Sequence, residues 1–290
     1  MSREKLVLFA LLLAITAVFI VAWVRSVRRQ PPPGGMRPTL LELAVGFVTN
    51  FFDTLGIGSF APTTSIFKLR RMVPDERIPG TLNAGHALPT VAEALVFIAI
   101  VNVGMATLVS LIAASVLGAW LGAGVVASWP RRRVQIGMGA TLLVAAVLFA
   151  MTNLKLIPGG GDALSLHGGL FAAGVVGNFA LGALMTLGIG LYAPCMILVS
   201  LLGMNPIAAF PIMMGSCAFL MPVGSLRFIE KGSYSPRTAL GLALGGVPGV
   251  LIAAFIVKSL PLTALRWGVI VVVLYAAGAM LRSAGKAPSP

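Results

Sequence analysis

One nine-residue pattern occurs twice in this chain, and it restricts the kinds of protein that the sequence can form. The segment TLGIGSFAP at residues 54–62 returns as TLGIGLYAP at residues 186–194, 132 residues later, with seven of the nine positions identical. Both copies interrupt long apolar stretches of the chain. Glycine-interrupted hydrophobic segments at matching places in two halves are typical of internally repeated membrane transporters, and they mark the substrate site.

The composition agrees with a membrane location. Hydrophobic residues make up 58% of the chain and charged residues only 10%, whereas soluble domains carry about 25% charged residues. Several stretches run for about 20 residues with almost no charge, which is the length that crosses a bilayer core. The net charge of +13 comes from short basic loops between apolar segments, a pattern of cytoplasmic loops and not of nucleic-acid binding.

The repeat extends beyond the motif, because Pro79 matches Pro211 and Gly118 matches Gly249 at nearly the same offset. We therefore expect an all-α polytopic membrane protein with two inverted repeats. Each repeat contains a broken or re-entrant helix pair and three transmembrane helices, and one extra transmembrane helix precedes them at Leu6–Val24. The expected parts are that helix with a Pro/Gly linker (1–38), the first repeat (39–155), a Gly-rich external connector (156–169), the second repeat (170–282) and a cytoplasmic tail (283–290).

The distribution of basic residues predicts the topology. Arginine and lysine both precede and follow the first broken segment, at residues 25–37 and 68–77, so both of its flanks are expected in the cytoplasm. A segment with both ends on one side is re-entrant, with its tip near Gly56 and Gly58. The second unit then runs in the opposite sense. The expected location is the bacterial inner membrane, with the N-terminus outside and the C-terminus in the cytoplasm. In the rival topology both broken segments cross fully and the units run parallel.

The residues around the two breaks predict an anion site. Pro62 and Pro194 suit the first turn of a restarted helix, and Ser59 is a plausible cap. A helix N-terminus offers free N–H groups and a partial positive charge. The alternative is that the glycines only permit close helix packing. The candidate substrate-binding residues are Asn50, Asp53, Thr54, Gly56, Gly58, Ser59, Phe60, Thr186, Gly188, Gly190 and Tyr192.

Four ionisable residues are candidates for gating or proton linkage. Asp53 is a carboxylate at membrane depth, where charge is costly and usually functional, although it could instead cap a half-helix or pair with a nearby basic residue. His86 and Glu93 lie on one helix face with Thr90 and could relay protons or form a buried polar cluster. Arg227 could attract an anion at the inner mouth or simply anchor its helix at the cytoplasmic surface.

No metal or cofactor site is expected, because the chain has two histidines in all and lacks a ligand set or a cofactor motif. We interpret Cys195 and Cys217 as unpaired small apolar residues. The spacings Gly118-x₃-Gly122 and Gly241-x₃-Gly245 favour close helix packing within one protomer or between the protomers of a homodimer. The partners expected are therefore a small anion, the lipid bilayer and a second copy of the chain, with no nucleic acid.

The segment from Gly46 to Phe60, together with its echo at Leu184 to Pro194, resembles the TauE/SafE sulfite-exporter family, also called TSUP proteins. The resemblance covers about residues 40–281 and leaves the Leu6–Val24 helix outside it. It implies a secondary transporter of small sulfur oxyanions, exporting sulfite or an organosulfonate by alternating access, without enzymatic activity. Proton-coupled uptake of thiosulfate or sulfate through Asp53 or His86 is the alternative, and a membrane assembly factor or enzyme is a third reading.

Overall fold

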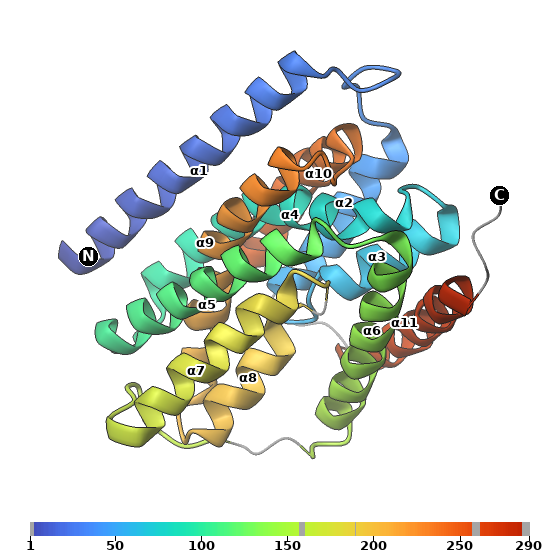
Figure 1. Cartoon of the computed structure of the whole chain (residues 1–290). Helices are drawn as coiled ribbons and strands as arrows, with labels where there is room; N and C mark the ends of the chain where they lie inside the picture. Colours follow the sequence, from blue (N-terminus) through green and yellow to red (C-terminus); the bar gives the residue numbers. More distant parts are fainter. Residues whose placement is uncertain (1–2, 157–159, 189, 257–261, 286–290) are drawn as a thin grey trace.

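The computed structural model describes residues 3–156, 160–188, 190–256 and 262–285 (Figure 1). Within these residues the chain is helical, and a single β-bridge joins Ala163 to Met204. The first unit comprises α2 (Leu40–Thr54), α3 (Phe60–Arg70), η1 (Asp75–Arg77), α4 (Ile78–Ile100), α5 (Met105–Val126) and α6 (Arg131–Asn153). The second unit comprises α7 (Gly168–Met185), α8 (Tyr192–Leu201), η2 (Pro206–Ala208), α9 (Ala209–Glu230), α10 (Pro236–Ile256) and α11 (Leu262–Gly285), and α1 (Arg3–Arg29) precedes both units.

The same succession of elements therefore occurs twice. Each unit has a broken helix pair, a single 3₁₀ turn and three long helices. The breaks fall at residues 55–59 and 186–191, where the two copies of the motif lie. With 15, 11 and 10 residues, α2, α3 and α8 are too short to cross a bilayer, which takes about 20 helical residues. The all-α fold class is confirmed.

Seven helices in the described part of the chain are long and apolar enough to span a membrane, namely α1, η1 with α4, α5, α6, α7, η2 with α9, and α10. Six of them are crossings that the sequence predicts. The other, α7, has 18 residues and was expected as one half of a broken pair. The remaining predicted crossing is α11, which follows residues 257–261, and these lie outside the described residues, as do parts of the predicted connector and tail.

Each broken pair packs against the other unit. Helix α2 lies along α10 and α7 lies along α5, while α4 crosses α9 at the centre and α6 pairs with α11. Glycines bring these backbones together. A Cβ atom at Gly118 would lie 2.0 Å from the carbonyl oxygen of Phe179, and one at Gly249 would lie 2.4 Å from that of Phe47. Phe47 and Phe179 are 132 residues apart, so the two contacts are counterparts in the repeat.

The two Gly-x₃-Gly spacings also serve packing inside this chain. A side chain at Gly122 would meet Ala183 of α7, and one at Gly245 would meet the Leu43 carbonyl of α2. The alternative of packing within one protomer is therefore the one that the structure uses for these glycines. The two Gly-x₃-Gly spacings therefore give no indication of a homodimer.

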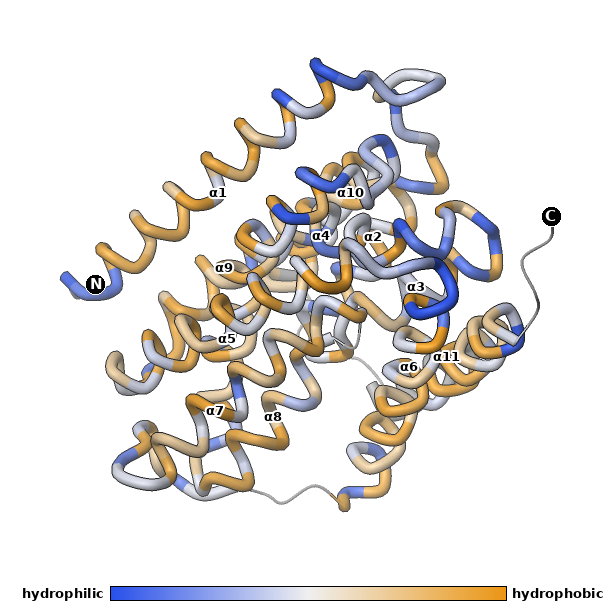
Figure 2. Tube along the Cα trace, in the orientation of Figure 1, coloured by the Kyte–Doolittle hydropathy of each residue, from blue (hydrophilic) through white to orange (hydrophobic). Residues whose placement is uncertain are grey.

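The helix connections gather at two ends of the molecule. At one end, which we call the charged end, Arg237 and Thr238 at the start of α10 hydrogen-bond Glu42 at the start of α2. Also there, the Ser235 backbone N–H donates to the Thr81 hydroxyl of α4. At the other end, which we call the connector end, the link between α6 and α7 hydrogen-bonds the links α4–α5 and α8–α9. Figure 2 shows hydrophilic stretches mainly around the ends of α1, α3 and α10, with largely apolar helices between.

Helix α1 runs along the outside of this arrangement, at the upper left in Figure 1. It packs on α9 and, less extensively, on α4, and buries one face that includes Leu12, Phe19 and Trp23. At its start the Lys5 ammonium donates to the carbonyl oxygens of Ala99 and Val101 at the end of α4. This contact satisfies carbonyl groups that the end of a helix leaves without partners.

We predict that Gly118→Val and Gly249→Val each destabilise the folded protein, because the added side chain meets a backbone carbonyl that cannot move without separating two helices. Overpacking of this kind costs about 1–3 kcal/mol. Thermal denaturation of the detergent-solubilised protein measures the effect. Gly278→Val is the control, since a Cβ atom at that helical position meets nothing within 4 Å. Equal melting temperatures for all three variants would contradict the packing role.

Candidate functional site

The repeated glycines are required by the backbone of the two breaks. Gly56 and Gly58 have φ values of +84° and +87°, and Gly188 and Gly190 have +90° and +74°. Residues with a Cβ atom rarely adopt such values, whereas glycine does so at no steric cost. The same Gly-x-Gly pattern thus produces the same sharp turn in both units, and a helix restarts shortly after each turn, as the sequence predicts.

The restarted helices leave backbone donors free at the breaks. The first hydrogen bonds within α3 and α8 are donated by Thr63 to Ser59 and by Cys195 to Leu191. The N–H groups that precede them, at Phe60, Ala61, Tyr192 and Ala193, have no acceptor inside their own helix. The proline that follows in each unit has no N–H group. Each break therefore ends in two donors that have no acceptor within their own helix, at the positive end of that helix.

A small cavity lies between the two breaks. Residues 57–61 and 190–194 both line it, so all four free N–H residues belong to its wall. The remaining lining residues come from helices around the breaks and are Asp53, Thr90, Ala145, Leu148, Phe149, Met185, Cys217 and Met221. The space open to the centres of water-sized molecules is about 20 Å³, which corresponds to one or two water molecules. In this conformation the space between the breaks is narrow.

The cavity contains six of the eleven residues that the sequence predicts for substrate binding, namely Asp53, Gly58, Ser59, Phe60, Gly190 and Tyr192. The other five, Asn50, Thr54, Gly56, Thr186 and Gly188, are not part of its lining. Thr186 is the clearest departure, because its hydroxyl donates to the Ala183 carbonyl of its own helix. It borders a separate groove between α5 and α7.

Asp53 and Ser59 face each other across the first break. The Ser59 side chain does not cap α3. Instead, its hydroxyl and its backbone N–H both lie near the Asp53 carboxyl group. This contact corresponds to the half-helix capping that the sequence analysis left open for Asp53. The carboxyl group is almost fully buried and borders the cavity beside the start of α3.

Glu93 connects the two breaks. It lies on α4 and is fully buried. Its Oε1 accepts a hydrogen bond from the Thr54 hydroxyl at 2.8 Å, and its Oε2 accepts one from the Tyr192 hydroxyl. Thr54 is the last residue of α2 and Tyr192 is the first residue of α8. One side chain of the first unit thus holds the end of one broken helix and the start of the other.

His86 joins the two halves of the first broken pair. Its Nδ1 lies 3.0 Å from Oδ1 of Asn50 on α2, and its Nε2 lies 3.1 Å from the hydroxyl of Thr63 on α3. The Asn50 amide nitrogen donates to the Gly46 carbonyl, which leaves Oδ1 to accept from the ring. The imidazole therefore donates from Nδ1 and accepts at Nε2. It is fully buried and lies outside the cavity lining. Because it bonds α2 and α3 at once, it fixes the angle between these two helices.

Arg227, a predicted gating residue, lies away from the cavity. Its guanidinium stacks over the ring of Trp120 at 3.8 Å from the centroid and pairs with Glu230 at 3.4 Å. Arg227 is near the end of α9 at the charged end, whereas the cavity lies along the middle of that helix. The contacts of Arg227 are therefore with side chains near the end of its own helix and of α5, and not with the cavity.

Several cavity residues were not predicted from the sequence. Met185, Cys217 and Met221 provide sulfur atoms, and Phe149 provides an aromatic face. Met185 had a usable signal, because it occupies the repeat position of Asp53. Cys217 had none, since an isolated cysteine in an apolar helix usually packs as a small apolar residue. Both cysteines are unpaired and buried, as expected. Among the described residues, no group of three or more His, Cys, Asp and Glu side chains is arranged to hold a metal.

The family comparison agrees with this arrangement. The model of the family described as sulfite exporter TauE/SafE matches residues 3–149, which is half of the chain. This chain belongs to the TauE/SafE family. The match includes α1, which the motif resemblance had left outside, and it covers the first break but not the second unit. Searches of curated proteins and of solved structures found no match. The TauE/SafE family is a family of membrane anion transporters, and this protein is a multi-pass member of it.

We predict that the two hydrogen bonds to Glu93 stabilise the protein interdependently. Thr54→Val and Tyr192→Phe each leave one buried carboxylate oxygen without a partner, which costs about 1–3 kcal/mol. Because both donors serve one acceptor, the double variant should depart from the sum of the single effects by more than about 0.5 kcal/mol. Thermal denaturation measures all three. Thr152→Val is the control, since that hydroxyl bonds only its own helix at Leu148. Strict additivity would contradict the bridging role.

Proposed function

We propose that this TauE/SafE protein moves a small sulfur oxyanion, such as sulfite or an organosulfonate, by alternating access around the cavity between the two breaks. The observation that carries the proposal is the presence of free N–H donors from two restarted helices in one cavity wall. Their partial positive charges suit a small anion, and the described lining contains no Lys or Arg that would hold the anion too firmly. The small volume of the cavity supports a constricted conformation, which would have to widen to pass the anion.

Export is the direction that the membrane potential favours. Moving one negative charge out of a cell with a negative interior yields about 2.3 kcal/mol per 100 mV, so an exporter needs no coupled ion. The second candidate is uptake of thiosulfate or sulfate coupled to protons. The position of Asp53 in the cavity wall supports it, because a carboxyl group there would gain or lose its proton beside the anion.

The proposed orientation places the charged end in the cytoplasm of an inner membrane protein. Both flanks of the first broken pair lie at the charged end. Glu42, which precedes the break, bonds Thr238 at the start of α10, and Thr81, which follows it, bonds Ser235 in the α9–α10 loop. Both flanks of the second broken pair lie at the connector end, where the backbone around Ala163 pairs with that around Met204. These contacts support re-entrant pairs in two oppositely oriented units, with the N-terminus outside.

Cysteine labelling from each side of the membrane tests this orientation. In a variant that lacks Cys195 and Cys217, single cysteines at positions 71, 132 and 231 should react only from the cytoplasmic side. A cysteine at position 162 should react only from outside. Labelling of position 71 from outside would overturn the re-entrant reading and favour full crossings with parallel units.

We predict that Gly58→Val and Gly190→Val each weaken anion binding by about tenfold or more, because a side chain there occupies the cavity and strains a backbone with positive φ. Binding of sulfite and of a sulfonate to the purified protein, followed by flux in vesicles, measures the effect. Gly203→Val is a matched control. It carries the same backbone strain at φ +76° in the loop after α8, outside the cavity. Unchanged affinity in both cavity variants would remove the basis for this site.

We predict that Asp53→Asn changes the pH dependence of transport while the melting temperature stays close to that of the wild type. The carboxylate is charged when it is ionised and then repels a bound anion, whereas the amide stays neutral at every pH. Flux should be measured from about pH 5 to about pH 8. Asp162→Asn in the connector is the control. Identical pH profiles for Asp53→Asn and the wild type would exclude a linked proton, and failure to assemble would make Asp53 structural.

A further inference from the structure

Sulfur-bearing side chains form a continuous part of the cavity wall. Met185 at the end of α7, and Cys217 and Met221 on α9, all line the cavity and are at most 2% exposed. The thiol of Cys217 lies 3.6 Å from the thioether sulfur of Met185. We call these three residues the sulfur wall. All three belong to the second unit.

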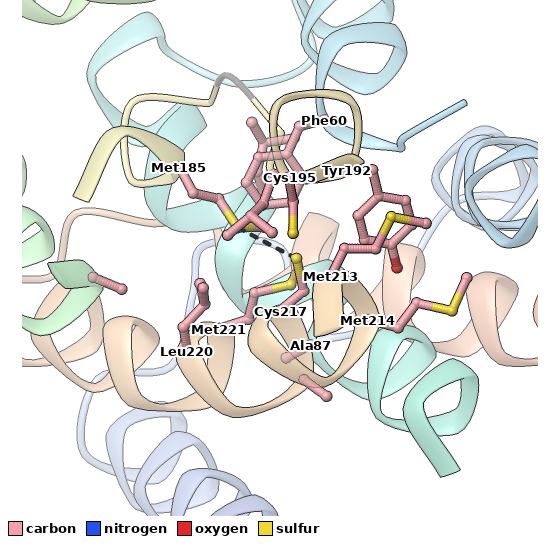
Figure 3. Close-up of a cluster of buried hydrophobic side chains, with 14 of the residues drawn as sticks. Phe60, Ala87, Met185, Tyr192, Cys195, Met213, Met214, Cys217, Leu220 and Met221 are labelled. Atoms are coloured by element: carbon pink, nitrogen blue, oxygen red, sulfur yellow. Dashed lines mark hydrogen bonds between the residues drawn. The ribbon is translucent and has the colours of Figure 1, made fainter. Parts of the chain in front are cut away.

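Figure 3 shows how the sulfur wall faces the breaks. Cys217 and Met221 extend from the ribbon of α9 toward Met185, Phe60 and Tyr192, and the dashed line joins the sulfur atoms of Cys217 and Met185. Phe60 and Tyr192 are the first residues of the two restarted helices. An anion between the breaks would therefore contact the free N–H groups on one part of its surface and sulfur atoms on another.

The two kinds of wall differ in what they offer an oxyanion. A thioether has no hydrogen to donate, and a thiol is a weak donor. An anionic oxygen that faces the sulfur wall gives up its water without a replacement, and a buried charged acceptor is costly to leave unpaired. Methionine and cysteine sulfur instead make favourable contacts with apolar or polarisable groups. The sulfur wall suits a side of the ligand that carries no oxygen.

We propose that the sulfur wall makes this cavity selective for anions with oxygen on one side only, such as alkyl sulfonates, over sulfate and phosphate. Cys217 is the specificity-determining residue, because its thiol contacts the Met185 sulfur of α7 and it lies one helical turn from Met221 on α9. The proposal rests on the proposed function of the same cavity. In this proposal, side chains of the second unit discriminate between anions, and the N–H groups at the starts of α3 and α8 attract the anion.

Charge alone offers a competing explanation, and the choice of ligands separates the two. Asp53 also lines the cavity and would repel a doubly charged ion more than a singly charged one. Methanesulfonate and sulfate differ both in charge and in the replacement of an oxygen by a methyl group. Methylphosphonate and phosphate carry similar charges near neutral pH and differ mainly in that replacement. Preference for the methyl compound in both pairs points to the sulfur wall.

The experiment measures the affinities of these four anions for the purified full-length protein by titration calorimetry. The wild type should bind each methyl compound about tenfold or more tightly than its oxygen counterpart, which corresponds to about 1.4 kcal/mol. Cys217→Ser introduces a hydroxyl donor and should narrow both ratios by about threefold or more, chiefly through tighter binding of sulfate and phosphate. Met221→Gln is a second variant with the same expected direction. Cys195→Ser is the matched control, since Cys195 is buried but is not part of the cavity lining.

The outcomes separate this proposal from the function on which it rests. Equal affinity for both members of each pair would overturn the sulfur wall and leave an anion site between the breaks. The same is true if Cys217→Ser changes the ratios no more than Cys195→Ser does. Preference confined to the sulfonate–sulfate pair would replace the sulfur wall with charge repulsion. If none of the anions binds, the proposed function and the sulfur wall fail together.

Discussion

The hydrogen bonds of Glu93 are the constraint on which the arrangement of the site depends. A buried carboxylate without partners is expensive inside a protein, and this one has two hydroxyl donors, Thr54 and Tyr192. The donors end one broken helix and begin another, so the partners that make Glu93 tolerable also fix the separation of the breaks. A movement that widens the cavity between these breaks has to give up one of these bonds or exchange it for a new partner.

The surrounding helices explain how such a movement is supported. Each broken pair begins with a helix that lies on a helix of the other unit, α2 on α10 and α7 on α5. The contacts at Gly118 and Gly249 are close enough that these pairs behave as rigid units. Neither repeat can therefore hold its own break in place alone. Motion of the α2–α10 pair relative to the α5–α7 pair would carry both breaks with it, which is the kind of movement that the proposed alternating access requires.

The sequence predicts the backbone of the site better than its side-chain chemistry. The repeated Gly-x-Gly and the following proline act locally, so both breaks and both restarted helices could be located from spacing alone. Thr54 and Thr186 show the limit of that reasoning. They occupy equivalent positions in the motif, and both hydroxyls bond a carbonyl of their own helix, yet Thr54 also reaches Glu93. The partner of Thr54 lies on α4, and the equivalent position on α9 is Ser225, so contacts between distant segments decide the difference.

The two units share a backbone plan but differ in chemistry, and this difference bears on which conformation the protein prefers. Asp53, His86 and Glu93 of the first unit correspond to Met185, Ala218 and Ser225 of the second. A symmetric backbone permits two related states in which either end is closed, but unequal side chains make their free energies unequal. At the charged end, Lys68 pairs with Asp75 at 2.7 Å and Arg237 pairs with Glu42 at 3.4 Å, and in both pairs the carboxylate is the buried partner. Because a buried carboxylate is costly to leave unpaired, these pairs strengthen the attachment of α3 to η1 and of α2 to α10, and in the described part of the second unit there is no matching pair around Met185, Ala218 and Ser225.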